Sequence, residues 1–114
     1  MTVAELRRKD VLRLSEILGD YETAKHIMNC FYVISNREQR LLVMENDYET
    51  YTRRHSYIEQ ENAKQIKAVN KLDKLLKPAG YEVMLSGGYA QIVRRDDTKT
   101  GCISEVFTYG YYYN

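Results

Sequence analysis

Apolar residues recur every three or four positions over the first two thirds of the chain and alternate with polar ones over much of the last third. The first spacing is typical of helices and the second of strands. Residues 1–34 therefore predict two short helices. Thr2 and Glu5 form a capping box at the start of the first helix. Gly19 suits the end of that helix, and Asp20 suits the N-cap of the next.

Residues 35–78 predict a long central helix, straight or kinked. Ser35 and Glu38 form a capping box at its start, and Pro78 ends it. One continuous helix is favoured, although at roughly 1.5 Å per residue it would be about 60 Å long, which exceeds the width of a compact domain of this chain length. The alternative is two helices with a bend near His55, because residues 46–57 are rich in weak helix formers.

A heptad pattern runs through the central stretch, with most of its a and d positions apolar or Tyr. Such a pattern is typical of a coiled-coil seam. With the excess helix length it predicts a homo-oligomer, most simply a dimer. In the bent alternative the helices can pack within one chain, and the argument for a dimer weakens. The predicted oligomerisation residues are Leu41, Met44, Tyr48, Tyr51, Ile58, Asn62, Val69 and Leu72.

Residues 80–114 predict a three-stranded antiparallel meander that ends in a Tyr-rich tail. Gly87-Gly88 is typical of a two-residue hairpin turn, which sets Leu85 opposite Ala90. A third strand is expected over residues 102–109, after a longer turn. The whole chain is therefore expected to form one α+β domain, with one face of the sheet packed on helix.

Composition narrows the function. The 114 residues carry a net charge of +1, so no strong overall field attracts nucleic acid or an acidic membrane. Eleven Tyr stand against two Phe and no Trp, and Tyr suits half-buried surfaces and interfaces. The two Cys lie far apart, the first ten residues are too charged for a signal peptide, and no apolar run could span a membrane. These features predict a cytoplasmic chain with no membrane contact.

Motifs for catalysis are missing from the sequence. Neither His26 nor His55 lies in a known nucleophile or metal motif, and there is no phosphate-binding loop. We therefore expect no enzyme activity, no cofactor and no metal. The corner around Gly19 has the outline of a helix-turn-helix, but Asp20 and Lys25 occupy positions that such a motif keeps apolar. An ordinary helical corner is favoured.

These observations favour a small intracellular protein–protein interaction module that dimerises through its helices. Its size suits a regulator or inhibitor of the kind that phages and mobile elements encode. The expected partner-binding residues combine cations with exposed aromatics, because such residues often anchor interfaces. They are Arg53, Arg54, Tyr57, Tyr89, Arg95, Tyr109, Tyr111 and Tyr112.

Two other functions stay open. The first is a nucleic-acid-binding regulator that uses the Gly19 corner, Arg53, Arg54 and a stripe of lysines in the central stretch, with strongly salt-dependent binding. The second is a binder of a small molecule or nucleotide, with a site between subunits lined by Tyr, Arg94 and Arg95.

Overall fold

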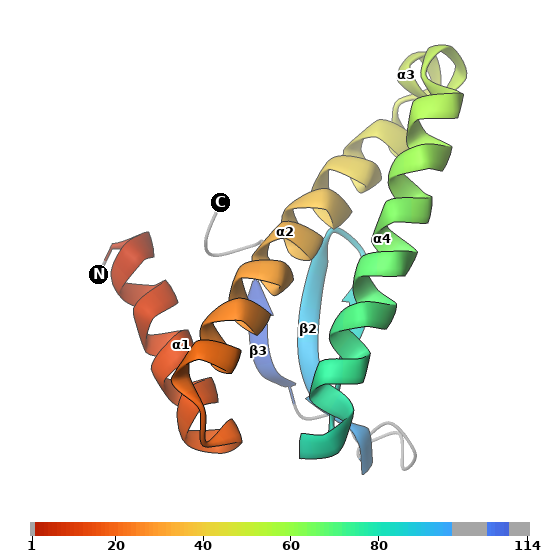
Figure 1. Cartoon of the computed structure of the whole chain (residues 1–114). Helices are drawn as coiled ribbons and strands as arrows, with labels where there is room; N and C mark the ends of the chain where they lie inside the picture. The colour runs from red at the N-terminus through yellow and green to blue at the C-terminus, as the bar shows by residue number, and fades with distance from the viewer. Residues whose placement is uncertain (1, 97–104, 110–114) are drawn as a thin grey trace.

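A computed structural model describes residues 2–96 and the backbone of residues 105–109. The class is α+β, as predicted, and mostly helical (Figure 1). The elements in chain order are α1 (Val3–Leu18), α2 (Tyr21–Asn46), α3 (Tyr48–Arg53), α4 (His55–Leu76), the 3-10 turn η1 (Lys77–Ala79), β1 (Tyr81–Ser86), β2 (Tyr89–Arg94) and β3 (Glu105–Tyr109).

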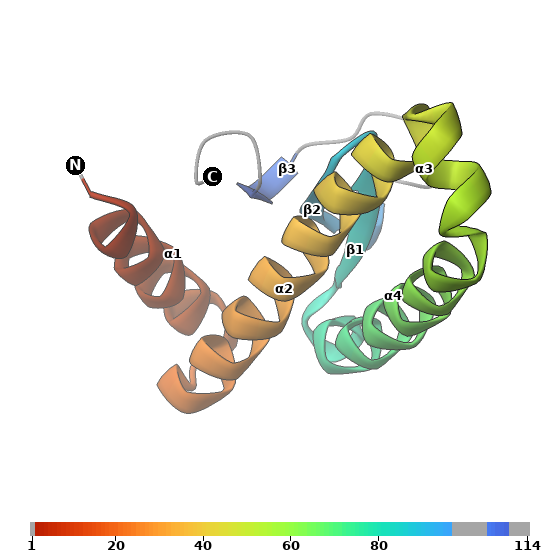
Figure 2. The same cartoon turned by 90° about the horizontal axis from the view of Figure 1, so that it is seen from above.

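The helices and the sheet form two layers. Helices α2 and α4 run side by side in opposite directions, with α3 at the tip that joins them, and they cover one face of the sheet (Figures 1 and 2). Helix α1 packs on α2, on the side away from α4. We call α2, α3 and α4 together the helical hairpin.

The single helix favoured for residues 36–77 is wrong, because the chain breaks twice. The first break is at Asp47, whose carboxylate accepts hydrogen bonds from the Glu49 amide at 3.2 Å and the Thr50 hydroxyl at 2.9 Å. These local bonds cap α3 and compete with continuation of α2. The second break is at Arg54. The two breaks let the halves fold back, so the largest dimension is 46 Å instead of the length of a rod.

The predicted helix start at Ser35 is also wrong. Helix α2 runs through that position without interruption, so residues 1–34 and 35–78 are not separate helical segments. Ser35 is fully buried, and its hydroxyl accepts a hydrogen bond from the Ala90 amide at 3.3 Å. The residue that resembled a cap is instead a polar tie between the helical layer and the sheet.

The predicted corner between the first two helices is confirmed. The Thr2 hydroxyl accepts from the Glu5 amide at 3.1 Å. Gly19 ends α1 with a φ of 77°, a conformation that costs glycine little. Asp20 caps α2 through the Glu22 amide at 3.2 Å.

The predicted β1–β2 hairpin and its register are confirmed, with Leu85 opposite Ala90 and Val83 opposite Ile92. Strand β3 pairs antiparallel with β2, so the sheet order is β1-β2-β3. The register of that second pairing shifts between Ile92 and Val93. Residues 102–104, where the third strand was expected to begin, lie outside the described residues.

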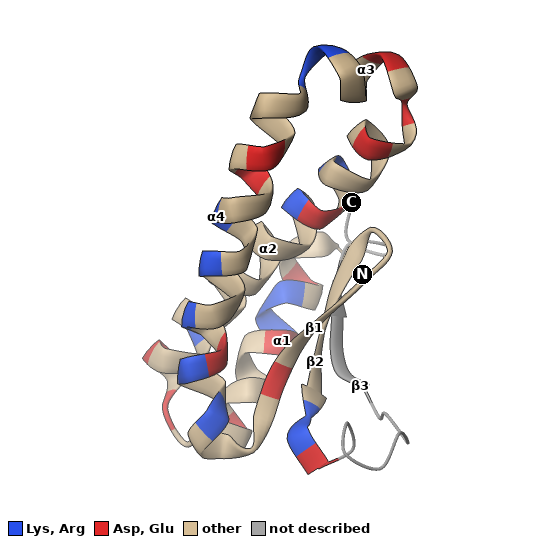
Figure 3. Cartoon of the chain, turned by 90° about the vertical axis from the view of Figure 1, so that its right-hand side faces the viewer, with Lys and Arg blue, Asp and Glu red and all other residues tan. Residues whose placement is uncertain are grey.

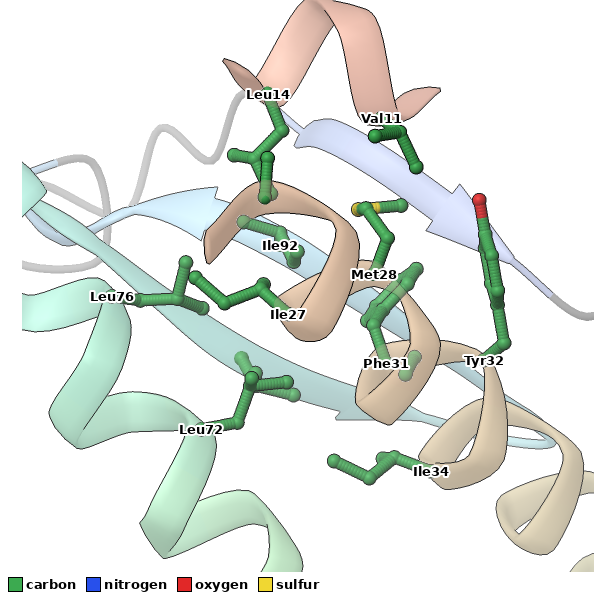
Figure 4. Close-up of a cluster of buried hydrophobic side chains, with 13 residues drawn as sticks. Val11, Leu14, Ile27, Met28, Phe31, Tyr32, Ile34, Leu72, Leu76 and Ile92 are labelled. Atoms are coloured by element: carbon green, nitrogen blue, oxygen red, sulfur yellow. The ribbon is translucent and has the colours of Figure 1, made fainter. Parts of the chain in front are cut away.

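One apolar cluster joins both layers and α1 (Figure 4). Phe31 of α2 and Leu76 of α4 are fully buried in it, as is Ile92 of β2. Tyr32 ties α1 to α2, because its ring lies 4.7 Å beneath the Arg7 guanidinium and its hydroxyl donates to Asp10 at 3.4 Å. None of the helices in the described ranges is both long and apolar enough to cross a membrane.

Candidate functional site

The outer face of the helical hairpin, opposite the sheet, carries two hollows. Ser35 and Asp73 bond to the sheet, at the Ala90 and Val83 amides. Val33 comes two residues before Ser35 on α2, and Lys71 comes two residues before Asp73 on α4. Each therefore lies roughly 200° around its helix from the residue that bonds to the sheet. Val33 and Lys71 line the first hollow, which thus opens away from the sheet.

The first hollow has a volume of about 340 Å³ and lies between α2 and α4 near the α1 end of the hairpin. Its floor is apolar, formed by Val33, Ala68, Leu72 and Leu75, and Arg37 and Lys71 stand at its edges. Val33 is 54% exposed and Leu75 is 39% exposed, although both are large apolar side chains. The full lining is His26, Asn29, Cys30, Val33, Arg37, Ala68, Lys71, Leu72 and Leu75.

The second hollow, of about 400 Å³, lies toward the α3 tip. The Arg54 guanidinium sits 4.8 Å above the Tyr57 ring, which holds this cation at the edge of the hollow. Val43 is the most exposed apolar residue of the lining, at 65%. The lining residues are Gln39, Arg40, Val43, Met44, Arg54 and Tyr57.

The two hollows lie in line along the hairpin. On α2, six of the nine lining positions follow one another at spacings of four and three residues, which is the repeat of a single helix edge. They are His26, Cys30, Val33, Arg37, Arg40 and Met44. On α4, Leu75, Lys71 and Ala68 are spaced by four and three residues, and Tyr57 comes eleven residues before Ala68, which is about three full turns and keeps it on the same helix edge. We call the two hollows and the stretch between them the outer groove.

An ion-pair network bridges the middle of the outer groove. Arg37 Nε lies 3.2 Å from Glu61 Oε2, and Lys64 Nζ lies 3.4 Å from Glu61 Oε1. The Arg37 guanidinium also donates to Gln65 Oε1 at 3.2 Å. Gln65 is buried and donates to the Ile34 carbonyl at 2.8 Å, so this network fixes α4 against α2.

The electrostatics of the outer groove are dominated by cations. Desolvation acts to raise the pKa of Glu61, but Lys64, Arg37 and Arg40 outweigh it and lower that pKa overall. Glu61 therefore stays ionised and offsets only part of the positive charge. The cations on or beside the lining are Arg37, Arg40, Arg54, Lys64 and Lys71.

A thiol and an imidazole meet at the α1 end of the outer groove. Cys30 Sγ lies 3.9 Å from His26 Nε2, one helical turn away. Both are metal-ligand types, but no group of three His, Cys, Asp or Glu gathers anywhere in the described part of the chain. We therefore interpret the pair as part of the groove wall.

The structure separates the predicted partner-binding residues into two regions. Arg54 and Tyr57 line the outer groove, and the adjacent Arg53 pairs with Glu49 at 3.1 Å. Tyr89 and Arg95 belong to the sheet layer and are half-buried, so they do not join the tip residues. The backbone of Tyr109 ends β3, whereas Tyr111 and Tyr112 lie outside the described residues.

The predicted oligomerisation residues also divide. Leu41, Ile58 and Leu72 are buried within the single chain, where the apolar seam of one half of the hairpin meets the other. Met44, Asn62 and Val69 are half-buried, and Asn62 donates to Glu45 at 3.1 Å. Tyr48, at 82%, and Tyr51, at 40%, are exposed on α3.

The sequence interpretation missed the α1 end of the outer groove. The signal was present as exposed apolar residues at helical spacing, such as Val33 on α2 and Leu75 on α4. The predicted helix boundary at Ser35 separated Val33 from Arg37, which concealed their common edge. The favoured single helix also kept α4 away from α2, and only the alternative with a bend near His55 allowed the two to pack within one chain.

A comparison with known protein families, with curated proteins and with solved structures finds no match for this chain.

Proposed function

We propose that the chain is a small, non-enzymatic protein–protein interaction module that binds a helical segment of another protein in the outer groove. The single observation that carries this proposal is the exposed apolar floor between α2 and α4, edged by Arg37 and Lys71. Its biological role would be that of a regulator or inhibitor, because a module without enzyme activity of its own works by changing the activity of the protein that it binds.

The shape of the site supports a helical partner. Grooves between two parallel or antiparallel helices accept a third helix, which presents apolar side chains at every third or fourth position. Val33 of α2 and Leu75 of α4 both offer apolar surface to such a helix. Because both are substantially exposed in the single chain, covering them would add apolar burial at about 25 cal/mol per Å².

The test is affinity purification from the native host with three tagged chains: wild type, Val33→Glu and Ile66→Glu. Ile66 is 62% exposed on α4 and does not line the outer groove, so its variant is a matched control for an added surface charge. We expect a protein that wild type and Ile66→Glu retain and that Val33→Glu loses. The retained protein, once purified, should bind the wild-type chain directly in titration calorimetry, with no other component present.

Two results would contradict this proposal. One is that no protein is retained by the wild-type chain under conditions in which it stays folded. The other is that Val33→Glu and wild type retain the same protein equally, because the partner would then bind elsewhere.

Nucleic-acid binding is the second candidate, and a lysine stripe on α4 favours it. Figure 3 shows blue segments repeating along α4. Lys67 and Lys74 of this helix are exposed and do not line the outer groove. This function predicts that Lys67→Glu with Lys74→Glu abolishes retention on DNA or RNA and that retention falls steeply with salt. Absence of binding at low ionic strength would exclude it.

A further inference from the structure

From the dimensions and charge of the outer groove, we infer that its occupant is an acidic amphipathic helix of about five turns from a different protein. This inference rests on the proposed function, since it names the chemistry of the partner that the outer groove takes.

The length of the occupant follows from the groove edge on α2. The lining positions run from His26 to Met44, which at roughly 1.5 Å per residue is about 27 Å. Each hollow offers apolar surface, from Val33 and Leu75 in one and from Val43 and Met44 in the other. A helix that fills both hollows therefore needs two apolar anchors roughly ten residues apart, because Val33 and Val43 are separated by about 15 Å along α2.

The charge of the occupant follows from both walls. Arg37 and Arg40 stand on the α2 wall, and Arg54 and Lys71 stand on the α4 side. Within residues 2–96, neither Arg40 nor Arg54 forms a direct ion pair with a carboxylate. A helix with Asp or Glu on both sides of its apolar stripe would supply carboxylates to these cations, and such complementarity raises association rates and specificity.

A second copy of the chain fits this surface poorly. A two-fold contact places the same patch on both partners, so it would bring Arg40, Arg54 and Lys71 of one copy against the same cations of the other. A copy that instead inserted α2 or α4 would have to withdraw that helix from its own core, where Phe31 and Leu72 are buried. Both of these arrangements are disfavoured, which supports an occupant from another protein.

Nucleic acid fits the cations but not the floor of the outer groove. Phosphates would pair with Arg40 and Arg54, but they would leave the apolar surface of Val33 and Leu75 either exposed or covered by unmatched polar groups. An amphipathic helix satisfies both features at once.

The experiment uses the full chain and two synthetic helical probes in fluorescence anisotropy. The acidic probe has about 18 residues, Leu anchors near both ends about ten positions apart, and Glu along both flanks. The basic probe differs only in carrying Lys in place of Glu. We expect the acidic probe to bind at least about tenfold more tightly at low salt, with a difference that shrinks as salt rises.

Matched variants connect that binding to Arg40 and Arg54. Arg40→Gln with Arg54→Gln should weaken binding of the acidic probe by about tenfold. Arg53→Gln is the control, because Arg53 neighbours Arg54 but pairs with Glu49 and does not line the outer groove. It should leave binding of the acidic probe unchanged. Equal losses in the two variants would contradict a specific contact to the outer groove.

The outcomes separate this inference from the proposed function. If both probes bind equally and Val33→Glu abolishes both, the outer groove takes helices without preference for acid, so the inference fails and the proposed function stands. If a DNA oligonucleotide displaces the acidic probe while Lys67→Glu with Lys74→Glu prevents that displacement, nucleic acid is the ligand and both fail. If light scattering finds a dimer of wild type but a monomer of Val33→Glu, the occupant is a second copy and the inference fails.

Discussion

At the scale of single residues, Gly88 fixes how the β1–β2 hairpin meets the helical layer. Its φ is 95°, in the left-handed region that residues with a Cβ rarely adopt, and a Cβ there would lie 2.9 Å from Leu42 Cδ2 of α2. The Leu42 side chain is partly exposed and can move, but the backbone strain cannot be relieved in the same way. The positive φ is therefore the main reason that glycine is needed at position 88, and the close approach of Leu42 is the lesser one.

Replacing Gly88 by Ala should lower the free energy of unfolding by about 1–3 kcal/mol, measured by urea denaturation. Gly87→Ala is the matched control, because no atom lies within 4 Å of a Cβ at Gly87 and its φ is not positive. That variant should change the free energy of unfolding by less than about 1 kcal/mol. Equal losses in the two variants would contradict the conformational argument.

Asp73 adds a second prediction at this scale, through its pKa. Burial is the largest influence and raises the pKa above the ordinary value of 3.8, with a smaller contribution from Glu82; the Val83 hydrogen bond and Arg95 act in the opposite direction. An acid with a raised pKa in the folded state stabilises the fold fully below its unfolded pKa. It loses that contribution as the pH rises through the folded value.

Asp73→Asn removes this charge while its amide oxygen can still accept from the Val83 amide, which bonds to Asp73 at 2.7 Å in wild type. At pH 7 the variant should therefore melt at a higher temperature than wild type. The difference should shrink as the pH falls toward and below 3.8, where the wild-type carboxyl is protonated in both states. A wild-type chain that melts higher than Asp73→Asn at pH 7 would show that the carboxylate is net stabilising.

Residues also show which features are readable from sequence. The caps at Thr2, Gly19 and Asp20 were predicted because each acts on a neighbour within a few positions. Ser35 was misread because its partner, the Ala90 amide, is far away in the chain. A serine three residues before a glutamate gives the same sequence pattern whether it caps a helix or bonds the middle of a helix to a sheet.

At the scale of elements, the heptad pattern identified part of the buried face but not its partner, and two of its positions, Tyr48 and Tyr51, are exposed. Leu41, Ile58 and Leu72 are buried, as the pattern required, yet their partner is the other half of the same hairpin. A repeat of apolar positions states only that a face must be covered. The choice between the same chain and a second copy depends on a turn, which here consists of two breaks, one capped by the Asp47 carboxylate and one at Arg54.

The β1–β2 hairpin was predicted more closely, because its register depends on local geometry. A two-residue turn at Gly87-Gly88 leaves one pairing, and the alternation of apolar residues selects the buried face. Val83 and Ile92 are buried as this predicts, although Leu85 is 38% exposed. Val93, on the opposite face by alternation, is also fully buried, next to the register shift that follows Ile92.

At the scale of the whole molecule, one side of the helical layer meets the sheet, and no other part of residues 2–96 covers the two hollows on the opposite side. Asp73, Ser35 and Leu76 are committed to the inner side, whereas Val33, Arg40 and Lys71 remain on the outer face. Sequence analysis named Arg54 and Tyr57 because basic and aromatic residues gather there. The α1 end of the outer groove emerged only when two helices from distant parts of the sequence were set side by side.

The central claim is that the outer groove is the binding surface, and nuclear magnetic resonance tests it most directly. Amide shifts of the isotope-labelled chain would be recorded as the acidic helical probe, or the purified partner, is added. We predict the largest changes along the outer groove, at Val33, Arg40, Tyr57 and Lys71, with little change in β1. Changes concentrated in the sheet or at Tyr109–Asn114, with the outer groove unaffected, would contradict the claim.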